Sequence, residues 1–136
     1  MLSQEERSKL KIDFKNPIHI LQSFKERGKS LFGNIPMNEM LDEVKRHVLN
    51  YQRSVIVPDD RPSTQSTHSA IFVTDYGKLA SIPVVIDKDK ITILTLKDVI
   101  KDEVNPNWHI GQFNEIGSKK GLTALPLHYR ANNGKA

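Results

Sequence analysis

Residues 68–99, with the sequence HSAIFVTDYGKLASIPVVIDKDKITILTLKDV, decide the fold of this chain. Three runs rich in β-branched residues are separated by two polar breaks, at residues 75–78 and 87–90, and the residue types in these breaks favour turns. A short connection cannot return a strand parallel to its predecessor. The stretch therefore predicts a three-stranded antiparallel meander.

The third run has apolar residues on both faces of the expected strand. A strand with two apolar faces belongs near the middle of a sheet, with helices over at least one side. In the run before it, Pro83 has no N–H to donate, which predicts a bulge or an unpaired edge. Strict alternation places Ile91, Ile93, Thr95 and Lys97 on one face and Thr92, Leu94, Leu96 and Asp98 on the other.

Three helices are expected before the meander. Ser3 and Glu6 have the spacing of a capping box, which predicts a helix from Gln4 to about Ile12. Asn16 and Pro17 begin a second helix that ends near residues 33–34. The third covers residues 37–52. Apolar spacing directs Ile18, Ile20, Leu21 and Phe24 of the second helix, and Met37, Met40, Leu41, Val44, Val48 and Tyr51 of the third, toward the core, and leaves Asp42, Glu43, Lys45 and Arg46 toward solvent.

The remaining segments complete one α+β domain. Residues 54–57 are a short strand candidate, and residues 58–67 form a polar linker rich in turn formers. Residues 100–104 finish the last strand or form one helical turn, residues 105–107 make a turn, residues 108–113 are a further strand or a loop packed on the sheet, and residues 122–129 are extended. We expect a helical arm at 1–15, N-terminal helices packed on an antiparallel sheet within a single α+β domain at 16–128, and a flexible tail at 129–136.

Composition limits the classes of function. The chain has 136 residues and no cysteine, which excludes a thiol nucleophile, a zinc–thiolate site and a disulfide framework. No apolar run approaches the ~20 residues of a membrane span, and the polar N-terminus is no signal peptide, so a cytoplasmic location without membrane contact is expected. The net charge of +4 is compatible with a nucleic-acid partner.

Histidines and an arginine are the candidate catalytic residues. His19 and Arg27 lie eight residues apart on the second helix, on one stripe of its surface. A histidine that exchanges a proton near neutral pH, beside an arginine that holds a phosphate, is what attack by a ribose 2′-hydroxyl requires. The alternative is an exposed helix face with a solvated arginine. His47 borders the buried stripe of its helix, where a hydrogen-bonded histidine is the alternative, and His68 begins a strand after the linker.

A second group of residues has the chemistry of a single-stranded RNA surface. Trp108 offers an aromatic platform, amides offer donors, and lysines offer positive charge for phosphates. The alternative is that Trp108 fills the core, and for Lys97 it is a lysine whose stem packs on the sheet. The candidate RNA-binding residues are Lys97, Trp108, His109, Gln112, Lys119 and Lys120.

No metal or cofactor is expected from the sequence. Asp98, Asp102 and Glu103 offer oxygen ligands to a divalent cation, but acidic residues at the edge of a sheet are usually solvated, and no cluster has metal-ligand spacing.

Several of these features together resemble a known family. The His19-Ile20-Leu21 segment with Arg27 downstream, a helix ending in His47-Val48-Leu49, and a following meander resemble the RegB-type phage endoribonucleases and, more broadly, the RelE and BrnT groups of small RNase toxins, over residues 17–99. The resemblance implies a RelE-like scaffold and metal-independent RNA cleavage, with His19 as the first histidine and Arg27 as its basic partner. The second catalytic histidine is His47 or His68, and RNA and a protein antitoxin or host protein are the implied partners.

A non-enzymatic module is the alternative function. No two residues are forced together by their spacing as a catalytic pair would be. A phage or mobile-element protein that binds nucleic acid or a host protein through the same surface is therefore compatible with this sequence.

Overall fold

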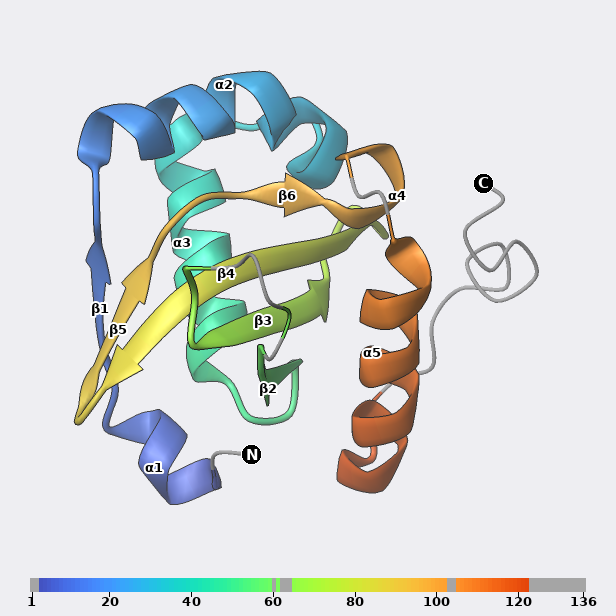
Figure 1. Cartoon of the computed structure of the whole chain (residues 1–136). Helices are drawn as coiled ribbons and strands as arrows, with labels where there is room; N and C mark the ends of the chain where they lie inside the picture. Colours follow the sequence, from blue (N-terminus) through green and yellow to red (C-terminus); the bar gives the residue numbers. More distant parts are fainter. Residues whose placement is uncertain (1–2, 60, 62–64, 103–104, 123–136) are drawn as a thin grey trace.

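The computed structural model describes residues 3–59, 61, 65–102 and 105–122, which form helices packed on a mixed sheet (Figure 1). The α+β class is confirmed, but the sheet is not a simple meander. Its order is β1-β5-β4-β3-β2, with β6 paired to β4 and a parallel pair between β1 and β5. The elements are α1 (Gln4–Ser8), β1 (Lys11–Phe14), α2 (Pro17–Phe32), α3 (Met37–Leu49), β2 (Ser54–Pro58), β3 (His68–Val73), β4 (Leu79–Asp87), β5 (Lys90–Ile93), β6 (Lys97–Asp98), α4 (Val99–Asp102) and α5 (Pro106–Lys120).

The two faces of the sheet carry separate cores. Helices α2 and α3 cover one face, where they bury side chains such as Phe24 and Val44 against Phe72 and Ile82 (Figure 1). Helix α5 covers part of the other face, where Ile110 and Phe113 pack on β2, β3 and β4. Neighbouring residues of one strand therefore face different helices.

The N-terminal segment adds both a helix and a strand. The capping box forms as expected, since the Ser3 hydroxyl accepts from the Glu6 N–H and the Glu6 carboxylate accepts from the Ser3 N–H. The helix ends at Ser8 instead of near Ile12, because β1 begins at Lys11 and pairs with β5 in parallel. A parallel edge strand supplied by residues so distant in the chain leaves no local sequence pattern.

Arg7 fastens this N-terminal segment to the rest of the domain. Its side chain is fully buried. One nitrogen, Nη1, donates to the carbonyls of Val48 and Asn50 and to the Ser54 hydroxyl, and Nη2 donates to the Ser54 carbonyl. The guanidinium thereby satisfies carbonyls at the end of α3 and the start of β2, which are far from it in sequence.

Helix α2 begins and ends where the sequence indicated, but its buried stripe is narrower. The Asn16 carboxamide caps the helix and Gly33, with φ of 82°, ends it. Ile20 and Phe24 are buried as expected, whereas Ile18 is 79% exposed and Leu21 is 43% exposed. The expectation for these two residues was wrong because the sheet meets only one side of the helix.

Helix α3 has the expected apolar stripe and one buried acid. Met40, Val44 and Val48 face the core. Glu43 was expected in solvent but is buried, because its carboxylate accepts a hydrogen bond from the Asp75 N–H in the β3–β4 turn. The helix ends at Leu49, before Tyr51.

A bulge opposite Pro83 determines which side chains of the last strand point toward each face of the sheet. Pro83 accepts a hydrogen bond from the Leu94 N–H, so its own nitrogen points toward the same neighbour and has nothing to donate. Beyond this point the chain leaves the ladder, and it rejoins at Lys97 opposite Ser81, one residue out of register with the β4–β5 pairing. The bulge or unpaired edge expected at Pro83 itself is absent, because β4 continues through Pro83 and pairs there with Ser69 of β3. The bulge lies in the neighbouring segment, at residues 94–96.

The bulge also reverses the expected faces beyond it. Ile91 and Ile93 face α2 and α3, as simple alternation requires. Leu96, expected on the opposite face, joins them in that core, and Lys97 faces the other way, beside Ser81. One extra residue in a strand shifts the alternation by one position, which corrects the expectation for these two residues.

The C-terminal part of the described chain is helical. Residues 108–113 were expected to be a strand or a loop, but they lie in α5, which has Pro106 in its first turn and Gly121 as its C-cap. The helical alternative at residues 100–104 holds for α4, as far as Asp102. The expectations for residues 123–136 lie outside the described residues. Among the described helices, none has the length and apolar character needed to span a membrane.

We predict that Arg7→Ala lowers the free energy of unfolding by about 3 kcal/mol, because the substitution removes the hydrogen bonds that a fully buried side chain makes to Val48, Asn50 and Ser54. Urea unfolding of the wild type and the variant measures this difference. The control is Lys9→Ala, at a neighbouring residue whose side chain is 70% exposed and pairs with Glu5, with an expected change below about 0.5 kcal/mol. Equal effects of the two substitutions would contradict a role for Arg7 in fastening the segment.

Candidate functional site

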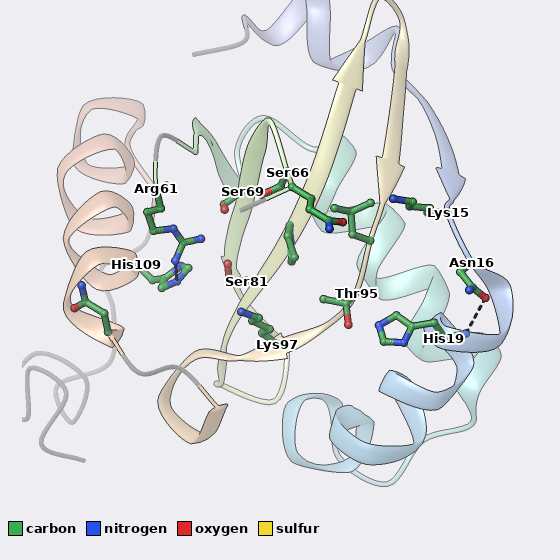
Figure 2. A pocket seen from close by; sticks show the side chains of 14 residues that line it. Lys15, Asn16, His19, Arg61, Ser66, Ser69, Ser81, Thr95, Lys97 and His109 are labelled. Atoms are coloured by element: carbon green, nitrogen blue, oxygen red, sulfur yellow. Dashed lines mark hydrogen bonds between the residues drawn. The ribbon is translucent and has the colours of Figure 1, made fainter. Parts of the chain in front are cut away.

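A cavity of about 660 Å³ lies where the start of α2, the bulge and the start of α5 meet over the sheet (Figure 2). It opens on the sheet face that α5 covers only in part. Strand β4 contributes Ser81 and Pro83, and the bulge contributes Leu94, Thr95 and Lys97. The other lining residues are Lys15, Asn16, His19, Arg61, Gln65, Ser66, Ser69, Asn105 and His109.

The lining of the cavity favours an anion. Lys15, Arg61 and Lys97 carry positive charge, and the lining also includes two histidines, His19 and His109. Among the described residues that line the cavity there is no Asp or Glu, and the serine and threonine hydroxyls offer donors beside the cations. Charges of one sign gathered in a concave site attract the opposite charge. A phosphate group meets these requirements in both charge and hydrogen-bonding capacity.

Arg61 is held in place by a buried carboxylate. The Arg61 Nε and Nη2 atoms donate to the two oxygens of Asp59, each at 2.8 Å, and the hydroxyls of Ser66 and Ser69 donate to Asp59 Oδ2. The Asp59 side chain is fully buried. The bidentate hydrogen bonds from Arg61, with help from the two serines, keep the pKa of Asp59 far below its ordinary value.

The remaining side of the Arg61 guanidinium contacts α5. Arg61 Nη1 lies 3.2 Å from His109 Nε2, and the guanidinium carbon lies 4.4 Å from the centre of the Trp108 ring. A guanidinium only donates, so His109 Nε2 accepts at this contact and that imidazole is neutral, with its proton on Nδ1. Figure 2 shows the Arg61 and His109 side chains directed toward each other. The Trp108 ring therefore packs against the guanidinium of Arg61. We had expected this ring to stack on an RNA base instead.

His19 stands across the cavity from this cluster, with Lys97 and Thr95 between them (Figure 2). Its backbone N–H donates to Asn16 Oδ1, which fixes the first turn of α2, while its side chain stays exposed at the cavity wall. An accessible histidine facing a cationic cavity can take or give a proton there.

Arg27 and His19 meet in a smaller adjoining cavity of about 240 Å³, which also includes Thr95 and Lys97. The two residues share one face of α2, as their spacing indicated. Arg27 Nε donates to Asp102 Oδ2 at 2.8 Å, which links α2 to α4 and holds the chain just beyond the bulge. We therefore assign to Arg27 the role of holding α4 against α2, next to His19.

The other two histidines considered for catalysis lie away from the main cavity. His47 is 2% exposed and stacks on Phe72 within the α2 and α3 core, where burial lowers its pKa to about 4. His68 pairs with Val84, whose side chain faces the same core. Ser69, the next residue, faces the cavity instead. Neither histidine belongs to the described lining of the cavity that includes His19.

Gln112, Lys119 and Lys120 also lie outside the cavity lining. The Lys120 Nζ donates to the Ser54 carbonyl and sits 3.9 Å from the centre of the Tyr51 ring, and burial, with the nearby Arg7 charge, lowers its pKa to about 7. Lys119 faces solvent and pairs with Glu115. Of the predicted RNA-binding residues, Lys97 and His109 line the cavity, and Trp108 contacts Arg61 and His109.

The acidic residues near the end of the sheet serve other purposes than metal binding. Asp98 is buried and accepts hydrogen bonds from the Ser30 hydroxyl and the Lys101 N–H. Asp102 accepts from Arg27 and from the Asp98 N–H. Glu103 lies outside the described residues. These contacts engage the oxygens that a cation would need.

Several cavity residues were missed by the sequence reasoning, above all Arg61 and its partner Asp59. Both lie in residues 58–67, which read as a polar linker. The sequence pattern that indicates this pair is an acid and an arginine two residues apart, directly after an apolar strand.

The chain matches no family model, no curated protein and no solved structure.

We predict that Asp59→Asn lowers the free energy of unfolding at neutral pH by about 2 kcal/mol, because the buried Arg61 contact loses its opposite charge. The Asp59 carboxylate has a pKa below its ordinary 3.8 in the folded protein. Its contribution is therefore complete above pH 3.8 and is lost as the pH falls below that value. Urea unfolding of both proteins across this range should show the gap closing in acid. A constant gap would contradict the ion pair as its cause.

Proposed function

We propose that this protein is a metal-independent endoribonuclease that cleaves RNA through attack of the 2′-hydroxyl on the adjacent phosphate. One observation carries the proposal. Side chains of Lys15, His19, Arg61, Lys97 and His109, from separate segments of the chain, line one cavity. Cleavage of this kind needs proton transfer at two oxygens and positive charge around a crowded phosphate.

Each role has a suitable residue. The exposed His19 takes the proton from the 2′-hydroxyl, and Lys97 and Arg61 hold the phosphate oxygens. For His109, the second histidine of the cavity, to supply the proton to the departing 5′-oxygen, its Nε2 must first leave Arg61 and take up a proton from solvent. The Asp59 carboxylate and the Trp108 ring fix the Arg61 guanidinium before a substrate arrives, and a fixed cation costs little to reorganise when charge develops on the phosphate.

The resemblance to the RegB, RelE and BrnT groups supports the same proposal. It names His19 and Arg27, and these residues line one small cavity beside the larger one. We propose that the helices and the sheet form a RelE-like scaffold, with His109 in place of His47 or His68 as the second histidine.

The second candidate function is nucleic-acid binding without cleavage. The contact between Arg61 and His109 Nε2 favours it, because a ring nitrogen that accepts from an arginine must change its partner before it can transfer a proton. A binder would use the same cations and show affinity without turnover.

We predict that the purified protein cleaves mixed-sequence RNA in EDTA and leaves 2′,3′-cyclic phosphate ends. In His19→Ala the rate should fall by about 10²- to 10⁴-fold, the usual contribution of a positioned acid–base group. The matched control is His68→Ala, on the opposite face of the sheet, which should keep full activity. Mapping of cleavage ends on one defined RNA gives both rates.

Intact RNA with the wild-type protein would reject the nuclease proposal in favour of the binder. Equal losses in His19→Ala and His68→Ala would remove His19 from the site. Circular dichroism of both variants verifies that they fold.

We predict that Lys97→Gln weakens RNA binding to a similar degree for all sequences and lowers the slope of log affinity against log salt by about 1, because one phosphate contact is lost. Lys119→Gln is the control. That lysine is exposed on α5, and its substitution should leave the slope unchanged. Fluorescence anisotropy of a labelled RNA at several salt concentrations measures both, and identical slopes for the two variants would contradict a phosphate contact at Lys97.

A further inference from the structure

A second polar cluster lies at the other end of the domain, where α3 meets the β3–β4 turn. Glu43 and His47 are one turn apart on α3, and Asp75 is in the turn. His47 Nε2 lies 3.5 Å from Glu43 Oε2 and 3.5 Å from Asp75 Oδ1, and one ligand-type atom from each residue falls within 4.8 Å of the others. Two carboxylates thus converge on one imidazole nitrogen.

The imidazole of His47 is buried without a hydrogen-bond partner. The residue is 2% exposed, and neither ring nitrogen has a partner among the described residues. The ring stacks on Phe72 with its centre 4.6 Å away, which fixes its orientation and directs Nε2 at the two carboxylates. A buried polar atom left unsatisfied costs about 1–3 kcal/mol. Such an atom, aimed at two acids, is placed to share a ligand with them.

The separations suit a tetrahedral metal ion. Zinc binds histidine nitrogen and carboxylate oxygen at about 2.1 Å, so neighbouring ligand atoms around it lie about 3.4 Å apart. Both measured separations from His47 Nε2 agree with this edge length. We propose that Glu43, His47 and Asp75 bind one Zn²⁺ ion, with water as the fourth ligand.

The surroundings hold the carboxylates in position. Glu43 Oε2 accepts from the Asp75 N–H at 2.9 Å, and Arg46 Nη2 donates to Asp75 Oδ2 at 3.0 Å, which leaves Oδ1 directed at His47. Hydrogen bonds of this kind orient ligands around a metal. Arg53 Nη1 lies 3.5 Å from Asp75 Oδ1, and its half-exposed side chain can turn to solvent when the ion binds.

Water and the ion can reach the cluster from one side. His47 and Asp75 line a cavity of about 400 Å³ together with Asn50, Gln52 and Arg53. None of its described lining residues belongs to the cavity of the proposed nuclease site. The ion would join α3 to the β3–β4 turn and so act on stability, independently of RNA cleavage.

Zn²⁺ titration of the chelator-stripped full chain tests the proposal. By calorimetry we expect one equivalent to bind the wild type, and Asp75→Asn, at a half-exposed residue, to weaken binding at least tenfold. Asp42→Asn, at an exposed acid on the same helix, is the control and should bind like the wild type. With ¹⁵N-labelled histidine, the ring nitrogens of His47 should shift on addition of Zn²⁺. Replacing Zn²⁺ with Co²⁺ should give the visible absorption of a four-coordinate ion.

Several results would overturn the zinc site. They are absence of stoichiometric Zn²⁺ binding to the wild type, equal affinity of the wild type and Asp75→Asn, or a Co²⁺ spectrum typical of six ligands. Equal weakening by Asp42→Asn and Asp75→Asn would also reject it, since surface acids in general would then be attracting the ion. The RNA assays depend on His19 and Lys97, so they can succeed or fail independently of this titration.

Discussion

The missing N–H of Pro83 is the constraint on which the site depends. A residue that could donate would let the last strand continue in register from β5 along β4. Proline interrupts the ladder, the chain gains one residue at 94–96, and Lys97 pairs with Ser81 one position out of register. Leu96 then enters the core under α2 and α3, and Lys97 enters the cavity. With the bulge, the chain buries Leu96 in the core and places the next residue, Lys97, in the cavity.

The arginines at and beside the cavity are each paired with an acid that lies outside its lining. Arg61 would be costly to order next to other cations if it stood alone, but Asp59 compensates its charge from beneath, in a buried bidentate contact. The carboxylate is not among the lining residues, and the described part of the lining includes Arg61 but no acid. Arg27 is similarly compensated by Asp102 outside the main cavity. Positive potential is kept at the surface where an anion would bind.

The sequence predicted the features that depend on local periodicity and helix caps. It did not predict the features that depend on contacts between distant residues. The limits of α2 and the start of α3 followed from Asn16, Pro17 and Pro36 and from the spacing of apolar residues. The parallel strand β1, the burial of Glu43 and the Asp59–Arg61 pair did not, because each depends on residues brought together only by the fold. Pro83 predicted an irregularity in the sheet. The β4–β6 pairing sets the direction of the register shift, and this direction determines toward which face of the sheet Lys97 points.

The histidines show why residue type alone was a poor guide to the site. His19 and His109 reach the cavity from the first turns of α2 and α5, whereas His47 and His68 face the opposite side of the sheet. An imidazole beside cations and hydroxyls is suited to proton transfer at a phosphate. An imidazole stacked on Phe72 and facing two carboxylates is suited to a metal. The same side chain thus acquires different chemistry on each face, and β-strand parity together with one bulge decides which residues share a face.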